Sequence, residues 1–199
     1  MSTDISEKGL ESLIVRHMTG TDGLAIVPGA MTEPPTPHCG TGYFAGSPRD
    51  YDRAHALDSV QLFAFLSSTQ PDAVTKLAMV DALDAKDLNR LKFLSRLSAE
   101  IGKRGVIDVL RKGIEHHPAG HFDLFYGTPS EGNAKAATLH VQNRFSVTRQ
   151  LAYSTDESRR ALDLGLFING LPIATFELKN SLTVGGSVPA HKSGCETAF

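Results

Sequence analysis

The sequence predicts a mixed α/β domain of the α+β type, with helices in its first half and a mixed central sheet in its second half. Three observations lead to this class. The 199 residues are 41 % hydrophobic, which suits one globular domain with a core of its own. Apolar residues recur at helical spacing up to about residue 113, and they alternate at strand spacing after about residue 121. We therefore expect a sheet flanked by helices, with a helical insert at about 52–113 and the core sheet at about 121–180.

Capping residues in the first half mark where helices begin and end. Ser6 precedes an amphipathic helix that ends near Gly20. Residues 27–50 are rich in Pro and Gly, and they predict a long irregular segment. Asp58 or Ser59 can cap the next helix, and Pro71 opens another. Two further helices are predicted, one with an apolar stripe that faces the core and one closed by a glycine. The stripe is Leu88, Leu91, Leu94, Leu97 and Ile101, and the glycine is Gly113.

The second half is predicted to be mainly strands. Residues 121–127, "HFDLFYG", alternate in polarity and predict a strand, as do residues 144–154, "RFSVTRQLAYS". Residues 131–143 between them have helical composition. The run "ALDLGLFINGLPIATFELKN", residues 161–180, predicts two strands joined by a tight turn. Both strands are apolar on both faces near the turn, which predicts central strands of the sheet. Residues 181–199 show no periodicity and predict an irregular end.

Charge and cysteine content narrow the functional classes. The net charge is −2 and the pI is about 6.4, so the overall charge does not indicate nucleic-acid binding, although a local basic patch is compatible with it. The cysteines, Cys39 and Cys195, lie far apart and outside any metal-binding spacing, which is typical of a protein of the reducing cytoplasm. No signal peptide and no apolar run of the ~20 residues that span a bilayer is evident. We expect a cytoplasmic protein without a membrane partner.

The 161–180 hairpin holds charged residues at the strand ends that lie away from its turn. These are Asp163 on the first strand and Glu177 and Lys179 on the second. A two-residue Asn169-Gly170 loop would pair Asp163 with Phe176 and point Glu177 to the opposite face. A three-residue loop with a bulge at Gly170 would pair Asp163 with Thr175. That pairing would place both carboxylates and Lys179 on one face. We predict the three-residue loop or an equivalent bulge, because charges scattered over two buried faces would be costly.

Two carboxylates on adjacent strands form a hard-oxygen site that suits Mg²⁺. The carbonyl of Leu178 can add a ligand, and Lys179 can hold an attacking water. This combination of metal ligands and an ammonium group predicts hydrolysis of phosphodiester bonds. The competing interpretation is an ordinary pair of charged residues at a strand end, because this spacing also arises by chance.

Beyond these motifs, "LDLGLFINGLPIATFELKN" closely resembles the nuclease core of the R subunit of type I restriction-modification enzymes. The run "QNRFSVTRQLAYS" resembles that family's N-x-F-x-V-x-x-Q strand, and "SEKGLESLIVRHM" resembles its first helix. Residues 52–113 resemble the helical insert of the same subfamily. The resemblance covers residues 6–182 and implies a PD-(D/E)xK restriction-endonuclease-like fold for residues 1–182.

The resemblance also implies roles for individual residues. Asp163 and Glu177 would bind Mg²⁺ and act in catalysis with Lys179. Glu11, on the first helix, would lie beside the metal; an ordinary solvated glutamate on a helix surface is its other interpretation. The expected DNA-binding residues are Asn143 and Gln150 of the resembling strand, together with Arg144 and Arg149, which lie near the expected site; ordinary surface arginines are the other interpretation of the last two. The implied partners are duplex DNA and the methyltransferase (M) and specificity (S) subunits, in an enzyme that uses ATP.

The sequence departs from the family pattern after Asn180. The family continues into a helix with a glutamine-x-x-x-tyrosine motif, but residues 183–199 contain neither glutamine nor tyrosine. No Walker motif occurs, so we expect no ATP site in this chain and no motor domain. The alternative function is therefore a truncated, non-catalytic remnant that only binds DNA or partner subunits.

Two other groups of residues carry weaker signals. The glycines at 40, 42 and 46 do not follow a predicted strand, and they favour a flexible turn over a phosphate-binding loop. His116, His117 and His121 are separated by Pro118 and Gly120, so we do not expect a zinc site there.

Overall fold

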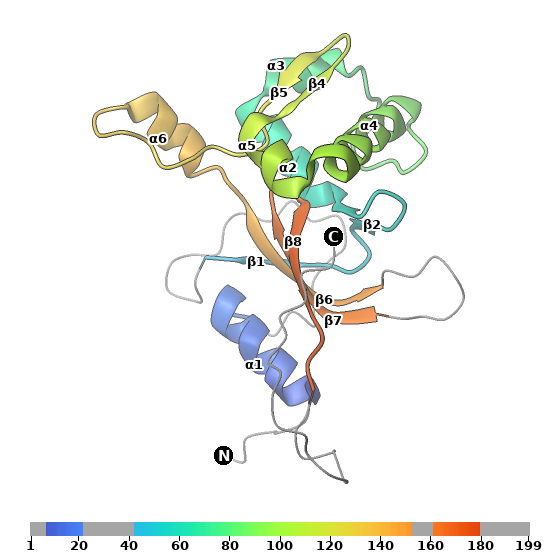
Figure 1. Cartoon of the computed structure of the whole chain (residues 1–199), viewed down its shortest axis with the longest axis vertical. Coiled ribbons are helices and arrows are strands. Elements are labelled where there is room, and N and C mark those ends of the chain that lie inside the picture. The colour runs from blue at the N-terminus through green and yellow to red at the C-terminus, as the bar shows by residue number, and fades with distance from the viewer. Residues whose placement is uncertain (1–6, 22–41, 153–160, 180–199) are drawn as a thin grey trace.

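The computed structural model describes residues 7–21, 42–152 and 161–179. Figure 1 shows a twisted sheet with α1 against it, a helical insert at one end of the sheet, and α6 standing out from the body. The helices are α1 (Glu7–Thr19), α2 (Ser59–Thr69), α3 (Pro71–Lys76), α4 (Leu88–Arg104), α5 (Val106–Lys112) and α6 (Ala134–His140). The strands are β1 (Phe44–Gly46), β2 (Tyr51–Asp52), β3 (Leu57–Asp58), β4 (Ile114–His116), β5 (Gly120–Phe122), β6 (Phe145–Ala152), β7 (Ala161–Ile168) and β8 (Leu171–Phe176). These elements confirm the predicted α/β class with a restriction-endonuclease-like arrangement.

The main sheet has the order β1-β6-β7-β8 in the described part of the chain. β1 runs parallel to β6, and the other pairs are antiparallel, so the sheet is mixed as predicted. Two expectations were wrong. The segment that was expected to be a flexible turn contains strand β1, and β8 lies at the edge of the sheet instead of in its centre. The central position next to β7 belongs to β6.

The β7–β8 hairpin has a two-residue turn and a bulge. Ile168 pairs with Leu171, and the turn residues Asn169 and Gly170 have φ of 50° and 81°, as the favoured hairpin turns require. The predicted three-residue loop is therefore wrong. The register shifts by one residue beyond Leu166, with Ile173 as the extra residue, so the equivalent bulge that we predicted is present.

The insert forms its own apolar core around the turn end of the hairpin. Buried side chains from α2, α4 and α5 pack with Leu171 of β8 and Leu124. Two predicted helix ends are confirmed, because the Asp58 carboxylate caps α2 and Gly113, with φ of 63°, closes α5; the predicted cap Ser6 lies outside the described residues. The predicted stripe of α4 is only partly correct. Its first residue, Leu88, is 71 % exposed, whereas Phe93 is buried. The fully buried members of the stripe are Leu94 and Leu97.

The strand predicted at 121–127 is also different in the structure. Strand β5 pairs with β4 in a separate two-stranded sheet of the insert and not with the main sheet. Strands β6, β7 and β8 and helix α6 match the predicted segments, whereas the short strands β2, β3 and β4 were not predicted.

Helix α1 covers one face of the main sheet. Its Val15 is fully buried against Val147 of β6 and Leu164 of β7. This packing fixes α1, and with it Glu11, beside the half of β6 and β7 that lies away from the insert. None of the helices that the structure describes is long and apolar enough to cross a membrane.

Candidate nuclease site

The register of the bulged hairpin brings Asp163 next to the segment that carries Glu177. Leu164 pairs with Phe176, the last residue of β8, and Asp163 and Glu177 are the next residues beyond this pair. The predicted pairing of Asp163 with Thr175 is wrong, because Thr175 pairs with Gly165. The backbone N–H of Leu178 donates a hydrogen bond to Oδ2 of Asp163 at 2.5 Å, which shows that the two chain segments are in contact.

The second strand leaves its charged groups open to solvent. Glu177 and Lys179 are exposed, whereas Asp163 is half-buried. Leu178 between them packs with the apolar cluster under α1, so it anchors the segment to the sheet. The three predicted catalytic residues therefore lie on adjoining segments at one end of the sheet, and their role in catalysis stays a prediction.

Glu11 is held in a different set of contacts. It is only 2 % exposed, and its Oε1 accepts a hydrogen bond from Nε of Arg149 at 2.8 Å. Its Oε2 accepts a hydrogen bond from Nε2 of Gln150 at 3.1 Å. A buried carboxylate needs such compensation, and the arginine provides the opposite charge. In this conformation, both oxygens of Glu11 are bonded to β6.

The metal prediction rests on the chemistry of the donors alone. Among the residues that the structure describes, no three His, Cys, Asp or Glu side chains come close enough together to hold a metal ion. Asp163, Glu177 and the carbonyl of Leu178 are hard-oxygen donors on adjoining segments. Mg²⁺ commonly takes one or two protein carboxylates and completes its shell with water and substrate phosphate, so this donor set fits Mg²⁺. The place of Glu11 beside a metal stays a prediction.

All four predicted DNA-binding residues have side chains bonded within the fold, and Arg149 and Gln150 are the two that bond to Glu11. Asn143 is buried and donates from Nδ2 to the backbone oxygen of Tyr126 at 2.7 Å. The guanidinium of Arg144 lies over the ring of Phe44, 4.0 Å from its centre, and its Nε donates to Gln61 at 2.7 Å. Gln150 is exposed and Arg149 is half-buried. DNA contact by these four residues stays a prediction.

Asn169, which the sequence predicted only as a turn residue, also makes side-chain contacts with distant segments. Asn169 is fully buried, and its Oδ1 accepts a hydrogen bond from the backbone N–H of Arg144 at 2.6 Å. Its Nδ2 donates to the backbone oxygen of Leu124 at 2.8 Å and to Oδ1 of Asn143 at 3.0 Å. The Asn-Gly pair signalled the turn, but the partners of its side chain come from distant segments.

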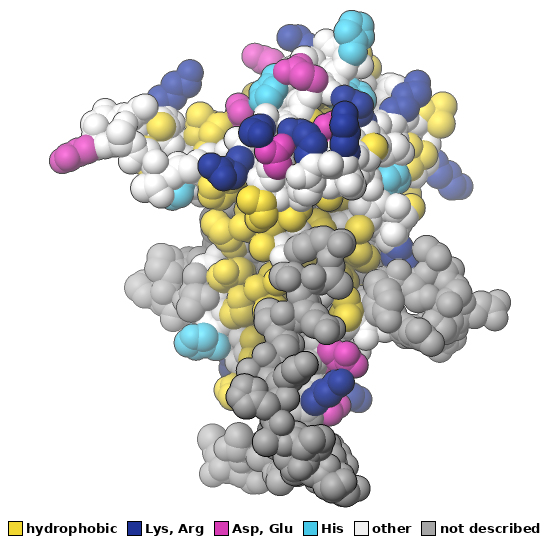
Figure 2. All heavy atoms as spheres, viewed as in Figure 1, with side chains coloured by type: hydrophobic (Ala, Val, Ile, Leu, Met, Phe, Trp, Pro, Cys, Tyr) yellow, Lys and Arg dark blue, Asp and Glu magenta, His cyan; other side chains and the backbone are white. Residues whose placement is uncertain are grey.

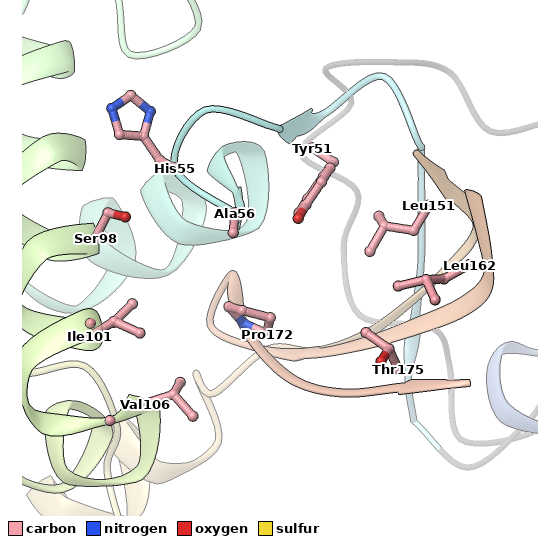
Figure 3. A pocket seen from close by; sticks show the side chains of 12 residues that line it. Tyr51, His55, Ala56, Ser98, Ile101, Val106, Leu151, Leu162, Pro172 and Thr175 are labelled. Atoms are coloured by element: carbon pink, nitrogen blue, oxygen red, sulfur yellow. The ribbon is translucent and has the colours of Figure 1, made fainter. Parts of the chain in front are cut away.

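An apolar cavity of about 700 Å³ lies between the insert and the sheet. Figure 3 shows Tyr51 and His55 on one side of it, Ile101 and Val106 from the insert helices, and sheet residues opposite them. The sheet residues are Leu151, Leu162, Pro172 and Thr175. Its lining contains no lysine or arginine, so the cavity suits apolar groups and not a DNA phosphate.

Several charged side chains of the insert form ion pairs with one another. Figure 2 shows basic and acidic side chains intermingled over the insert. Arg104 bonds to both Glu100 and Asp108, each within 2.9 Å. Among the histidines, His121 lies 2.8 Å from Glu115, and the ring of His116 packs edge-on against Phe93. This is the pattern of a solvated helical surface with ion pairs.

The comparisons with known proteins agree with the motifs. The family model described as "Type I restriction enzyme R protein N terminus" matches residues 86–192, which is more than half of the 199 residues. The match includes β6 and the whole β7–β8 hairpin. Neither the curated proteins nor the solved structures with which the chain was compared gave a match. On the strength of the family model, the chain belongs to the family of type I restriction enzyme R protein N termini.

Proposed function

We propose that this chain carries the Mg²⁺-dependent endonuclease activity of a type I restriction enzyme R subunit and hydrolyses phosphodiester bonds of duplex DNA. The family itself indicates the N-terminal region of such a subunit. The observation that carries the finer proposal is the register of the hairpin. The bulge at Ile173 supports an alignment of Asp163 with Glu177, because it shifts the register by one residue, and the bond from the N–H of Leu178 to Asp163 holds the two segments in contact.

Each residue of the candidate nuclease site has a distinct task in this proposal. Asp163, Glu177 and the carbonyl oxygen of Leu178 would hold Mg²⁺ at the exposed end of the hairpin. When bound, the ion lowers the charge on the phosphate and the pKa of a water. Lys179 follows Glu177 by two residues, and its ammonium group would orient the attacking water and stabilise the negative charge that develops on the phosphate. Because Glu177 and Lys179 are exposed, a DNA backbone can reach them without a rearrangement of the core.

The family supports a proposal for the wider assembly. The proposal places this domain in a restriction complex with M and S subunits. The ATP-driven motor of the R subunit would lie outside these 199 residues. The S subunit would select the target sequence, so the domain itself would cut without sequence preference. We therefore expect no stimulation of this chain by ATP.

A second candidate is a domain that folds and binds DNA or partner subunits but does not cut. The observation that favours it is the pairing of Glu11 with Arg149, which occupies an acidic residue expected near the metal. The nuclease proposal and the binding-only proposal predict different effects of removing the Lys179 side chain.

We expect the Lys179→Ala variant to nick supercoiled plasmid at least about 100-fold more slowly than the wild-type chain in Mg²⁺, because a positioned proton-transfer or charge-stabilising group typically contributes that much. The measurement is the rate of open-circle formation on agarose gels, with and without EDTA. Lys103→Ala is the matched control, since Lys103 is an exposed lysine on α4 in the insert. We expect its nicking rate to equal that of the wild type. Equal rates for wild type and Lys179→Ala would contradict catalysis, and retained DNA binding in both would then support the second candidate.

A further inference from the structure

Gln150 has a backbone conformation that is unusual in the middle of a strand. Its φ is +48°, in the left-handed region that side chains other than glycine rarely adopt. The pairing of β6 with β7 continues with the same register on both sides, through Arg149 with Leu164 and Leu151 with Leu162. No residue is inserted, so the conformation does not come from a bulge. Strain of this kind persists only where the surrounding structure maintains it, and it concentrates at functional sites.

The side chains of β6 change faces of the sheet at this left-handed residue. Residues two apart in a regular strand point to the same face. Here Arg149 bonds to Glu11 on the face covered by α1. Leu151 lies on the opposite face, where its Cδ2 would be 2.8 Å from a Cβ added to Gly165, and it lines the apolar cavity together with Leu162. Figure 3 shows these two leucines next to each other at the edge of that cavity.

The reversal occurs at the row of residues that forms the candidate site. Gln150 and Asp163 each fall between the pairs Arg149–Leu164 and Leu151–Leu162, so they occupy the same level of the sheet, and Glu177 directly follows Phe176, the partner of Leu164. The amide of Gln150 reaches out of this row to Oε2 of Glu11 on α1. The amide of Gln150 therefore connects the buried Glu11 of α1 to β6 at the level of Asp163.

We propose that Gln150 is a positioning residue of the nuclease site. Its left-handed backbone turns β6 at this row, and its amide fixes the Glu11 carboxylate relative to Asp163. The inference rests on the proposed function, because it assigns Gln150 an effect on metal binding by Asp163 and Glu177. A purely structural role, in which the amide only satisfies a buried carboxylate, would affect the stability of the fold and leave metal affinity unchanged.

The test uses Mn²⁺ as a probe for the Mg²⁺ site in the full 199-residue chain without DNA. Affinity is measured by water-proton relaxation, and the melting temperature by circular dichroism. In Gln150→Gly the left-handed backbone is free of strain but the amide is lost. We expect its melting temperature to stay within a few degrees of wild type, while Mn²⁺ affinity falls about 10-fold, as is typical when a residue that orients metal ligands is removed.

Ala78→Gly is the matched control for strain relief alone. Ala78 has a φ of 53° and lies in an exposed turn after α3, outside the candidate site. We expect its Mn²⁺ affinity to equal that of the wild type. Gln150→Asn is the second variant, because asparagine tolerates the left-handed conformation but its amide is one methylene shorter. If Gln150→Gly does not fold, weakened Mn²⁺ binding by Gln150→Asn supports the proposal, and unchanged binding overturns it.

A further variant distinguishes failure of this inference from failure of the proposed function. Asp163→Asn removes a predicted ligand directly, and we expect it to abolish Mn²⁺ binding. If Asp163→Asn does so while both Gln150 variants bind like wild type, Gln150 is structural and the proposed function stands. Both the Gln150 inference and the proposed function would be overturned if the wild-type chain bound no Mn²⁺, or if Asp163→Asn bound Mn²⁺ as tightly as the wild type.

Discussion

At pH 8 the Asp58→Asn variant is expected to be more stable than the wild-type chain by on the order of 4 kcal/mol, and near pH 4 the two are expected to be almost equally stable. Asp58 is fully buried at the start of α2, and burial raises the pKa of its carboxyl from 3.8 to about 7. The nearby Asp50 raises this pKa further, whereas the hydrogen bond from the backbone of Gln61 and the charge of Arg144 lower it. The effect of burial is the largest of these.

The sign follows from proton binding. Between pH 4 and pH 7 the folded chain keeps a proton on Asp58 that the unfolded chain has already lost. Stability from this group is therefore full below about pH 3.8, and it declines as the pH rises through 7, by about 1.4 kcal/mol for each pH unit. Asparagine has no such proton, and its side-chain oxygen can still accept the bond from the N–H of Gln61, which is 3.1 Å long in the wild type. The variant keeps the helix cap and loses the pH dependence.

The measurement is urea denaturation of both chains at half-unit steps from pH 4 to pH 8. Asp87→Asn is the matched control, because Asp87 caps α4 in the same way but is only partly buried. Hydrogen bonds from the backbone of Arg90 and Val80 lower the pKa of Asp87, so its contribution has the opposite sign and is lost as the pH falls. We expect no gain for Asp87→Asn at pH 8. A stability difference between wild type and Asp58→Asn that is the same at every pH would refute the interpretation.

The sequence predicted the parts of the fold that local chemistry determines. Asp58, Pro71 and Gly113 mark helix ends through their own backbone and capping preferences, and each lies where it was expected. Strand β1 is only three residues long and is held by distant β6, so no local pattern indicates it. The apolar return strand was expected in the centre of the sheet. It lies at the edge, and it is apolar because the insert covers it, as the packing of Ile173 against the insert core shows.

The candidate site was predictable in its composition but not in all its geometry. The need for a one-residue shift followed from the side-chain alternation between Asp163 and Glu177, and a bulge provides it. Its place at Ile173 has no sequence signal, because isoleucine is an ordinary strand residue. The contacts of Glu11 with Arg149 and Gln150 join residues 138 and 139 positions apart, and such pairs are not readable from spacing along the chain.

The Asn169→Ala variant is expected to lose about 4 kcal/mol of unfolding free energy, which is much of the total for a domain of this size. The change would leave the N–H of Arg144 and the carbonyl oxygen of Leu124 without these buried partners, and each such loss costs about 1–3 kcal/mol. Alanine is also disfavoured at the φ of 50° that the turn requires, which adds about 1 kcal/mol. Because this turn sets the start of the register, its loss would also disturb the alignment of Asp163 with Glu177.

Two variants separate the contribution of the side chain from that of the backbone. Asn169→Gly restores the left-handed conformation without the side chain, so it should be less destabilised than Asn169→Ala by about 1 kcal/mol. Asn133→Ala is the control for losing an asparagine at an exposed position, where the side chain caps α6 through a 3.0 Å bond, and it should cost about 1 kcal/mol. Urea denaturation at pH 7 followed by circular dichroism measures all three. If Asn169→Ala is no more destabilised than Asn133→Ala, the buried bonds of Asn169 do not hold the hairpin in place. The register would then have to depend on the packing of Gly170 against α2, where an added Cβ would lie 2.7 Å from the Cβ of Leu62.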